Sequence, residues 1–454
     1  MSAEPPSSHP MGLGSWIGDR GRKIIHTGFW SLIAKGCAAS NLFMSVPFAL
    51  HALGPEQFGA WVTLVSLVTL AGFLDFGFGN GTMNLIASAH SRQSKEDVAS
   101  ILHESRRVLR GVASGLAVVA IVAIPLVPWY HFLGMPESAA TQSRIAVAIV
   151  LLSVILAVPL NIANRVQLGL GRGDRAFRWQ AIGQVAALAA VISLASVHAS
   201  LALLTGAAVA TPLLASFANN YSLWHDPSLT VTFAASPERR LIIGHQIRRE
   251  GLMFFLLQLS VALAFSADLP LISIFRGSAE AGTYAIVQRL FSVIPLALSL
   301  VWAPLWPIYR QALVAGDQHW VMRTLHHSLI LAVAFAAVGS AILAIGFDQF
   351  VSAWVHRSLA VAGTMLAGFA FWCVFEAAGT AIATFLNAAS CMRYQLITSC
   401  TFAVLCFGGK VWVVANIGIT WIPWVTVVAY CLANVLPLLW FRNQIFPSIL
   451  AKKY

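Results

Sequence analysis

The sequence predicts an all-α polytopic membrane protein, with twelve transmembrane helices in two six-helix lobes related by an internal repeat. Three observations support this fold class. The chain of 454 residues is 58% hydrophobic and only 10% charged, with a mean hydropathy of +0.77. A soluble domain has about 25% charged residues. The other two observations are a series of long apolar stretches and a set of landmark residues that occurs twice.

A membrane-spanning helix needs about 20 mostly apolar residues, and twelve stretches of this chain meet that requirement. Helices are the expected form, because backbone polar groups inside a bilayer must be satisfied within the protein. Only short connections remain between the stretches, so no soluble domain fits. The predicted spans are residues 29–50, 59–89, 111–133, 145–168, 178–198, 200–222, 251–275, 282–308, 328–348, 361–388, 394–416 and 420–441.

The landmark residues of the first half recur in order, without a gap, 223 positions later. An ungapped repeat over that distance predicts a duplication, with chance matching of common glycines and prolines as the alternative. Two similar halves are typical of a transporter whose site lies between its repeats. The landmarks Gly28, Pro47, Gly54, Gly59 and Trp61 correspond to Gly251, Pro270, Gly277, Gly282 and Tyr284.

The net charge of +11 is distributed unevenly along the chain. If the N-terminus is cytoplasmic, 21 of the 28 Lys and Arg residues fall in cytoplasmic segments and three fall outside, at Arg144, Arg276 and Arg357. This distribution follows the positive-inside rule and predicts that both termini are cytoplasmic. The basic residues are therefore expected to contact anionic lipid headgroups, and no nucleic-acid partner is expected.

The spans divide the chain into an N-lobe, a linker and a C-lobe. We predict a cytoplasmic N-terminal segment over residues 1–28, in which an interfacial amphipathic helix and a flexible tail are both open interpretations. The helical spacing of the charged residues between residues 90 and 110 predicts a short helical extension into the cytoplasm. The remaining predicted parts are the N-lobe (29–222, helices 1–6), the interlobe linker (223–250), the C-lobe (251–441, helices 7–12) and a cytoplasmic tail (442–454).

Seven ionisable residues lie inside predicted spans, where facing lipid at the bilayer centre costs roughly 2.5–3.5 kcal/mol each. A net folding stability of about 5–15 kcal/mol does not tolerate seven such exposures. Most of these residues must therefore face a wet cavity, pair with one another, or extend to the interface. They are Lys35, Asp75, Arg165, Asp268, Arg289, Glu376 and Lys410.

The four cations are the candidate substrate-binding residues. Lys35 shares a helix face with small and polar residues, which indicates a cavity lining, with an internal salt bridge as the alternative. Arg165 and Lys410 lie nearer helix ends, so their long stems could instead carry the charge to the interface. Arg289 lies in the outer third of its helix, as Asp268 does, and direct pairing of the two is a second interpretation.

The candidate polar residues of the cavity, which include those that could couple transport to an ion, form a second group. Glu376 shares a face with Thr380 and Asn387, so it is either a proton carrier or part of a hydrogen-bonded structure. Asp75 lies among glycines that permit close helix contact, and a structural role is its alternative. The complete group is Asp75, Glu376, Asp268, Asn161 and Asn164.

Other short motifs do not indicate chemistry. Residues 169–174, GLGRGD, form a predicted cytoplasmic turn and lack the strand that a dinucleotide site needs. The six cysteines fall in or beside apolar helices with no metal-type spacing. We therefore expect no catalytic residue, no metal site and no cofactor.

One region resembles a known family. Pro47 is followed by LGPEQFGAW (53–61) and FLDFGFGNG (73–81), and GTYAIVQRL (282–290) is a weaker second copy. The chain resembles bacterial polysaccharide flippases of the Wzx type, in the multidrug/oligosaccharidyl-lipid/polysaccharide (MOP) exporter superfamily. The second copy departs from the first, with Arg276 before Gly277 and Ala281 in place of the aromatic residue.

The resemblance implies a MATE-like fold with two lobes around a central cavity and transport by alternating access. Its implied cargo is an undecaprenyl-pyrophosphate-linked oligosaccharide, an O-antigen or exopolysaccharide repeat unit, which crosses the bacterial inner membrane. Cavity cations suit the anionic pyrophosphate. Membrane lipids, a proton or other coupling cation, and a glycan polymerase are the further partners to consider.

Two other functions remain open. A multidrug exporter of the same superfamily would have a cavity dominated by carboxylates, whereas four cations accompany three acids here. A membrane glycan polymerase or ligase is the other candidate, but the short outer loops leave little room for catalytic residues. We therefore expect a transporter that is not an enzyme.

Overall fold

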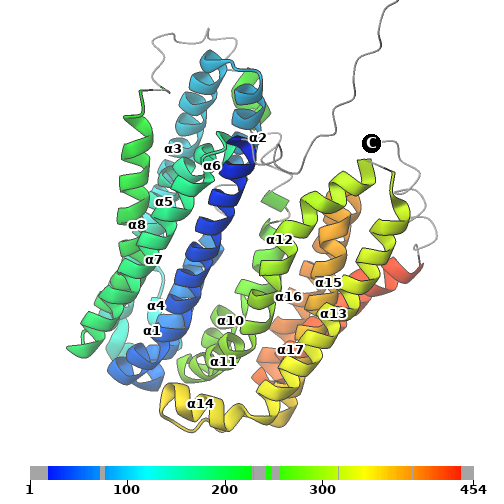
Figure 1. The fold of residues 1–454 in the computed structure, drawn as a ribbon. Helices are drawn as coiled ribbons and strands as arrows, with labels where there is room; N and C mark the ends of the chain where they lie inside the picture. The colour runs from blue at the N-terminus through cyan, green and yellow to red at the C-terminus, as the bar shows by residue number, and fades with distance from the viewer. Residues whose placement is uncertain are drawn as a thin grey trace, which may run out of the picture.

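The computed structural model describes residues 19–71, 77–227, 229, 242–247, 255–256, 258–314, 316–389 and 392–440. Within these residues every regular element is helical (Figure 1). The first half contains α1 (Asp19–Ala71), α2 (Phe78–Ser91), α3 (Lys95–Leu126), α4 (Trp129–Phe132), η2 (Glu137–Ala139), α5 (Ala140–Leu160), α6 (Ile162–Gly169), α7 (Gly173–Ser196) and α8 (Leu201–Trp224).

The second half contains a similar series of long and short helices. They are η3 (Ala262–Ser266), α10 (Asp268–Arg276), α11 (Ser278–Phe291), α12 (Val293–Val314), α13 (Gln318–Ile345), α14 (Phe347–Val355), α15 (Gly363–Ala388), α16 (Met392–Asn416), η4 (Ile419–Trp421), α17 (Ile422–Tyr430) and η5 (Cys431–Val435).

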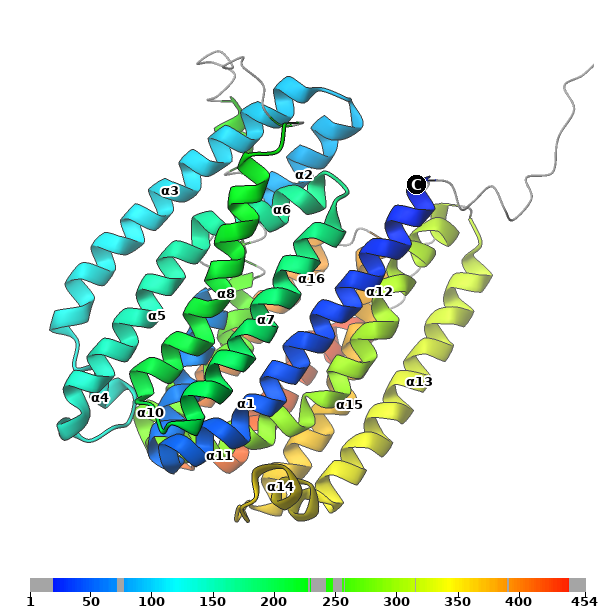
Figure 2. The same ribbon diagram turned by 60° about the vertical axis from the view of Figure 1, so that its left-hand side comes forward.

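The helices pack into two bundles, which we call the N-lobe and the C-lobe (Figures 1 and 2). In the N-lobe, α1 packs along α7, α7 along α8, α8 along α5 and α5 along α3. In the C-lobe, α15 contacts α12, α13 and α17, while α16 packs on α17 and α10. The predicted all-helical, two-lobed fold class is confirmed.

The outer surfaces of both lobes are suited to lipid. Large apolar side chains such as Val119 and Ile121 on α3, and Leu331 and Val338 on α13, are more than half exposed. Eleven segments in the described part of the chain are long and apolar enough to cross a membrane. The chain is therefore a multi-pass membrane protein.

A glycine reverses the chain at the same place in each half. Gly54 interrupts α1 with φ 72° and ψ 173°, and Gly277 separates α10 from α11 with φ 94° and ψ 165°. This backbone region is essentially restricted to glycine. After Gly54 the chain turns back, so that α2 lies at the same end of the molecule as the start of α1 (Figure 1). The repeated landmarks of the sequence thus correspond to one repeated backbone feature.

Three predicted spans are divided in the structure. The segment predicted at 59–89 consists of the second part of α1 and the separate helix α2, which follows Gly77. In the segment predicted at 145–168, α5 ends at Leu160, just after Pro159, and α6 begins at Ile162. A proline inside a helix weakens the helix around it. The segment at 282–308 is divided at Ser292 into α11 and α12.

Other boundaries differ in length rather than in kind. The helical extension expected within 90–110 is the first part of α3, which begins at Lys95 with the Ser94 hydroxyl accepting a hydrogen bond from the Asp97 N–H. The short helix α14 was not predicted. Residues 1–18, 230–241 and 441–454, and the residue Asp75, lie outside the described part of the chain, as do the predictions made for them.

The lobes contact each other at one end of the molecule. There α1 packs on α10, α11 and α14 of the C-lobe, and the lobes separate toward the end where α2 lies (Figure 1). The contact is close because Gly59 has no side chain: a Cβ atom at that position would lie 1.6 Å from the carbonyl oxygen of Ser278. In the orientation predicted from the basic residues, the contacting end faces outward and the separated end faces the cytoplasm.

Candidate functional site

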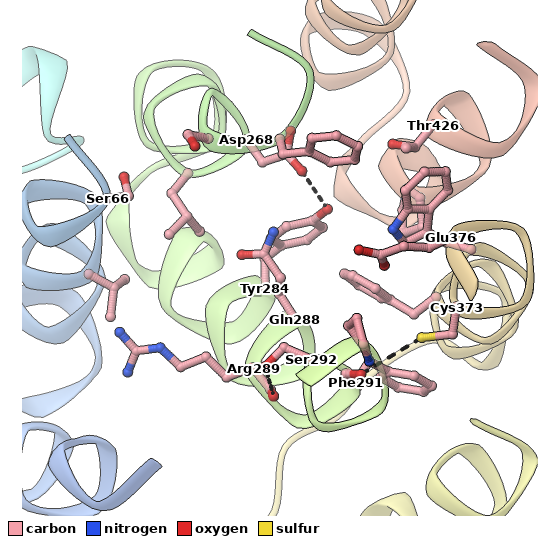
Figure 3. Close-up of a pocket in the computed structure, with 18 of the residues that line it drawn as sticks. Ser66, Asp268, Tyr284, Gln288, Arg289, Phe291, Ser292, Cys373, Glu376 and Thr426 are labelled. Atoms are coloured by element: carbon pink, nitrogen blue, oxygen red, sulfur yellow. Dashed lines mark hydrogen bonds between the residues drawn. The ribbon is translucent and has the colours of Figure 1, made fainter. Parts of the chain in front are cut away.

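A cavity of about 380 Å³ lies between the lobes. The N-lobe contributes four lining residues, all on α1, and the only polar one in the described lining is Ser66. The C-lobe contributes the charged groups, which lie on α10, α11, α15 and α16. These groups and their nearest polar neighbours are Asp268, Tyr284, Gln288, Arg289, Glu376 and Lys410. We call this space the central cavity (Figure 3).

A buried ion pair forms one wall of the central cavity. The Lys410 Nζ lies 2.7 Å from Asp268 Oδ1 and also donates to the Ala264 carbonyl at 2.6 Å. The Tyr284 hydroxyl donates to Asp268 Oδ2 at 3.0 Å (Figure 3). The side chains of Lys410 and Asp268 are only 1% and 5% exposed. Each charge therefore has both an opposite charge and a second hydrogen-bond partner, as burial requires.

This ion pair corrects two interpretations from the sequence. Asp268 pairs with Lys410, not with Arg289. Lys410 does not extend to the membrane interface, because its side chain points into the C-lobe toward η3. Depth along a helix indicates whether a lysine can reach the interface, but the direction of its side chain depends on which helices pack around it.

Of the two cations in the described lining of the central cavity, Lys410 is paired and Arg289 has no ion-pair partner. Its guanidinium extends toward α1 (Figure 3), where Cζ lies 5.7 Å from the centroid of the Trp61 ring. Its Nη1 atom is buried and has no hydrogen-bond partner in the structure. No ion pair to Arg289 occurs among the described residues. A buried guanidinium with a free donor is suited to an incoming anion.

Glu376 lies on the opposite side of the central cavity, on α15 (Figure 3). Its carboxylate is hydrogen-bonded to the side chain of Trp372 on the same helix. Its backbone carbonyl accepts from the Thr380 hydroxyl. Within the described part of the chain it forms no ion pair. Glu376 also lines a second cavity inside the C-lobe.

The other predicted residues lie away from the central cavity. Lys35 is partly exposed on α1, seven positions before the cavity-lining Leu42 and so two helical turns away on the same face. Asn161, Asn164 and Arg165 lie at the junction of α5 and α6, where the Asn219 Nδ2 donates to Asn164 Oδ1 at 2.7 Å. Substrate binding by Lys35 and Arg165 stays a prediction.

Several lining residues were not predicted as part of a site. Tyr284 was identified only as a landmark of the repeat, and Gln288 only as a neighbour of Arg289 on helix α11. Their spacing of four residues on one helix face was an available signal. Trp372 and Thr426 lie in apolar stretches of sequence like many others in this chain, so no local sequence pattern distinguishes them.

The sequence profile of the family described as "Polysaccharide biosynthesis protein" matches residues 28–312. The chain belongs to this family. A search of curated proteins found no match. The family and the fold together make this chain a MOP-type membrane transporter.

Solved structures share the fold at low sequence identity. One is an inward-facing conformation of a multidrug resistance MATE family transporter of the MOP superfamily, with a TM-score of 0.75, 15% identity, and coverage of 93% of this chain and 100% of that chain. A MOP superfamily transporter from Pyrococcus furiosus, described as having reverse polarity of its binding pocket, has a TM-score of 0.67, 16% identity and coverage of 98% and 100%. An outward-facing MATE structure has a TM-score of 0.65, 16% identity and coverage of 97% and 99%.

Proposed function

We propose that this transporter is a flippase for an oligosaccharide linked through pyrophosphate to a polyprenyl lipid, and that it acts by alternating access in the bacterial inner membrane. The main supporting observation is the unpaired Arg289 guanidinium in the central cavity. A cargo that neutralises a buried cation must present an anionic group there. Pyrophosphate supplies that charge and several acceptor oxygens.

The paired charges on the cavity wall leave Arg289 as the anion site. Lys410 and Asp268 neutralise each other at 2.7 Å, so that pair has little net attraction for an anion. An outward movement of the anionic cargo is favoured by an inside-negative potential, by about 2.3 kcal/mol per charge per 100 mV. The lipid tail remains in the bilayer, and the glycan extends toward the end where the lobes separate.

Lys35 provides a second cation on the route to the cavity. It lies on the same face of α1 as Leu42, two turns closer to the N-terminal end of the helix. In the predicted orientation that end is cytoplasmic. The cargo would contact Lys35 before its pyrophosphate reaches Arg289.

The proposal is tested by replacing Arg289 and measuring flipping of a fluorescent lipid-linked oligosaccharide in proteoliposomes. Arg289→Ala should lower the initial rate about tenfold or more, since one charge-assisted contact is worth about 1.5–3 kcal/mol, while Arg289→Lys should retain an intermediate rate because the charge is kept and the geometry is not. The matched control is Arg323→Ala, which removes an exposed cation of α13 in the same lobe. A normal rate for Arg289→Ala would remove this residue from the mechanism.

Coupling to a proton or another cation is a separate part of the proposal, and Glu376 is its candidate residue. A carboxylate that transfers a proton must change its charge during the cycle, and Glu376 faces the central cavity without an ionic partner among the described residues. Glu376→Gln keeps the shape and removes the charge. It should make flipping insensitive to an imposed pH gradient, as measured in the same proteoliposomes. If the wild-type rate does not respond to the gradient, or the variant responds as the wild type does, coupling lies elsewhere.

Export of small organic cations through the central cavity is the alternative, because one structural neighbour is a multidrug resistance transporter. An organic cation would have to occupy the space beside the unpaired Arg289, where like charges repel. The central cavity therefore favours the lipid-linked glycan.

A further inference from the structure

A second cavity lies inside the C-lobe and shares only Phe265, Trp372 and Glu376 with the described lining of the central cavity. Its volume is about 600 Å³, and it is lined by residues of η3, α13, α15, α16 and the helical segment from α17 to the end of the described chain. This volume is within the range of about 300–1,000 Å³ that is usual for sites of drug-sized ligands. We call it the C-lobe cavity.

Aromatic rings form much of its wall. Phe265 lies 5.5 Å from Trp372 between ring centroids, and Tyr430 lies 5.6 Å from Trp372 and 5.7 Å from Phe402. Phe375 joins the same group, at 6.5 Å from Tyr430. All five rings line the C-lobe cavity. The faces of aromatic rings attract cations, most strongly where water is excluded.

The charge of the lining has one sign. Glu376 is the acidic residue of the C-lobe cavity, and no Lys or Arg is found among its described lining residues. Lys410 is held by Asp268 and the Ala264 carbonyl and lines the central cavity instead. A ligand inside the C-lobe cavity would therefore meet a carboxylate and aromatic rings together.

We propose that the C-lobe cavity binds a lipophilic organic cation of drug size, with Glu376 as its counter-charge and the five rings as its apolar walls. This site is distinct from the anion site at Arg289 and does not depend on the proposed glycan transport.

A hydrocarbon chain, such as part of a lipid tail, fits the same space less well. It would leave the Glu376 carboxylate without a counter-charge in an apolar environment, which is unfavourable. The Tyr394 hydroxyl and the Gln395 Nε2 are buried on the wall of this cavity and have no hydrogen-bond partner. A hydrocarbon chain would offer them none. An organic cation with a polar substituent satisfies these groups better.

Two probes of equal size and opposite charge test the proposal. Tritiated tetraphenylphosphonium and tetraphenylborate are each titrated against the purified full-length protein in detergent. The phosphonium should bind saturably and the borate should not. Glu376→Gln should weaken phosphonium binding about tenfold or more, the loss expected for a favourable desolvated ionic contact. The matched control Asp348→Asn, which removes an exposed carboxylate of α14, should leave it unchanged.

Because Glu376 also borders the central cavity, a second pair of variants locates the bound probe. Ala383 lines only the C-lobe cavity and Val65 lines only the central cavity. Ala383→Phe should abolish phosphonium binding, and Val65→Phe should preserve it. These variants also serve if Glu376→Gln does not fold. Equal binding of both probes, binding that survives Ala383→Phe, or no phosphonium binding at all would overturn the proposal.

Discussion

Asp268 is a charged residue that is almost completely buried. Its side chain is 5% exposed, and its charge is balanced by Lys410 from α16 and by the Tyr284 hydroxyl from α11. Removing one partner of a buried ion pair leaves the other charge uncompensated, whereas replacing both with neutral groups avoids that cost. The pair also joins three helices, so it fixes how α10, α11 and α16 meet beside the cavity.

We predict that Lys410→Met destabilises the protein by about 3–5 kcal/mol, and that adding Asp268→Asn restores most of the lost stability. The thermal unfolding midpoint of the purified protein in detergent is the measurement. Asp348→Asn, at an exposed position of α14, is the control for removing a carboxylate alone. A double variant that is no more stable than Lys410→Met would show that the charges do not compensate each other.

For single residues, the sequence allowed only part of the site to be predicted. The cost of ionisable groups in a membrane identified Asp268, Arg289, Glu376 and Lys410, all of which line the central cavity. The same argument also selected Arg165, and Asn161 and Asn164 were added because they share its helix face, but none of the three lines the central cavity. Periodicity places a residue on a helix face, but which partner that face meets depends on packing between helices distant in the sequence.

Among the helices, α1 and α11 form the closest contact between the lobes. The backbone of Gly59 meets the backbone of Ser278, and Gly282 lies against Phe58 and Gly59. The Ser278 hydroxyl also donates to the Gly134 carbonyl of the N-lobe at 3.3 Å. Alternating access requires this contact to break, because it closes the cavity at the outward end in the predicted orientation. Glycine at these positions lets two backbones meet without intervening side chains.

We predict that Gly59→Ala separates α1 from α11, because the added Cβ would lie 1.6 Å from the Ser278 oxygen. Its effect is measured as labelling of a cysteine at Ser66, inside the central cavity, by an impermeant maleimide added outside cells. In an otherwise cysteine-free protein, labelling should be several-fold faster with Gly59→Ala. Gly36→Ala on the same helix, where a Cβ would have no neighbour within 4 Å, should not change it. Unchanged labelling at normal abundance would mean that another contact closes the outward end.

For the whole molecule, the arrangement of the two lobes follows from where their contact lies. Because α1 packs on the C-lobe through α10, α11 and α14, the lobes diverge toward the other end (Figure 1). The positive-inside distribution of basic residues predicts that this diverging end faces the cytoplasm. In that orientation the proposed anionic cargo would enter between the lobes from the cytoplasmic side.

We predict that reporter fusions after Ser94 and after Tyr454 both report a cytoplasmic location. The expectation depends on the 21 basic residues in segments assigned to the cytoplasm, and an alkaline phosphatase and fluorescent protein pair gives opposite signals on the two sides. A fusion in the outer loop at Glu137, between α4 and α5, is the control for the other side. Phosphatase activity at Ser94 or Tyr454 would contradict the proposed topology.

The architecture was predictable to a larger extent than the site. Apolar length and the repeated glycines were sufficient for the two-lobed helical fold, because both can be read from the sequence without knowing how the helices pack. The reversal at Gly54, the break after Pro159 and the position of α14 changed the boundaries but not the class. The C-lobe cavity was not predicted, since it depends on how α13, α15 and α16 are spaced.

The repeat at a fixed distance of 223 residues also has an evolutionary consequence. The glycines that reverse the chain and pack the lobes are present in both halves, at Gly54 and Gly277 and at Gly59 and Gly282. The residues of the cavity differ: Asp268 corresponds to Ser45, and Arg289 corresponds to Ser66. After a duplication, one copy can therefore retain the architecture while the other acquires charge. In this protein the charged residues of the described cavity lining all lie in the second half, so substitutions that alter cargo preference there would leave the paired glycines in place.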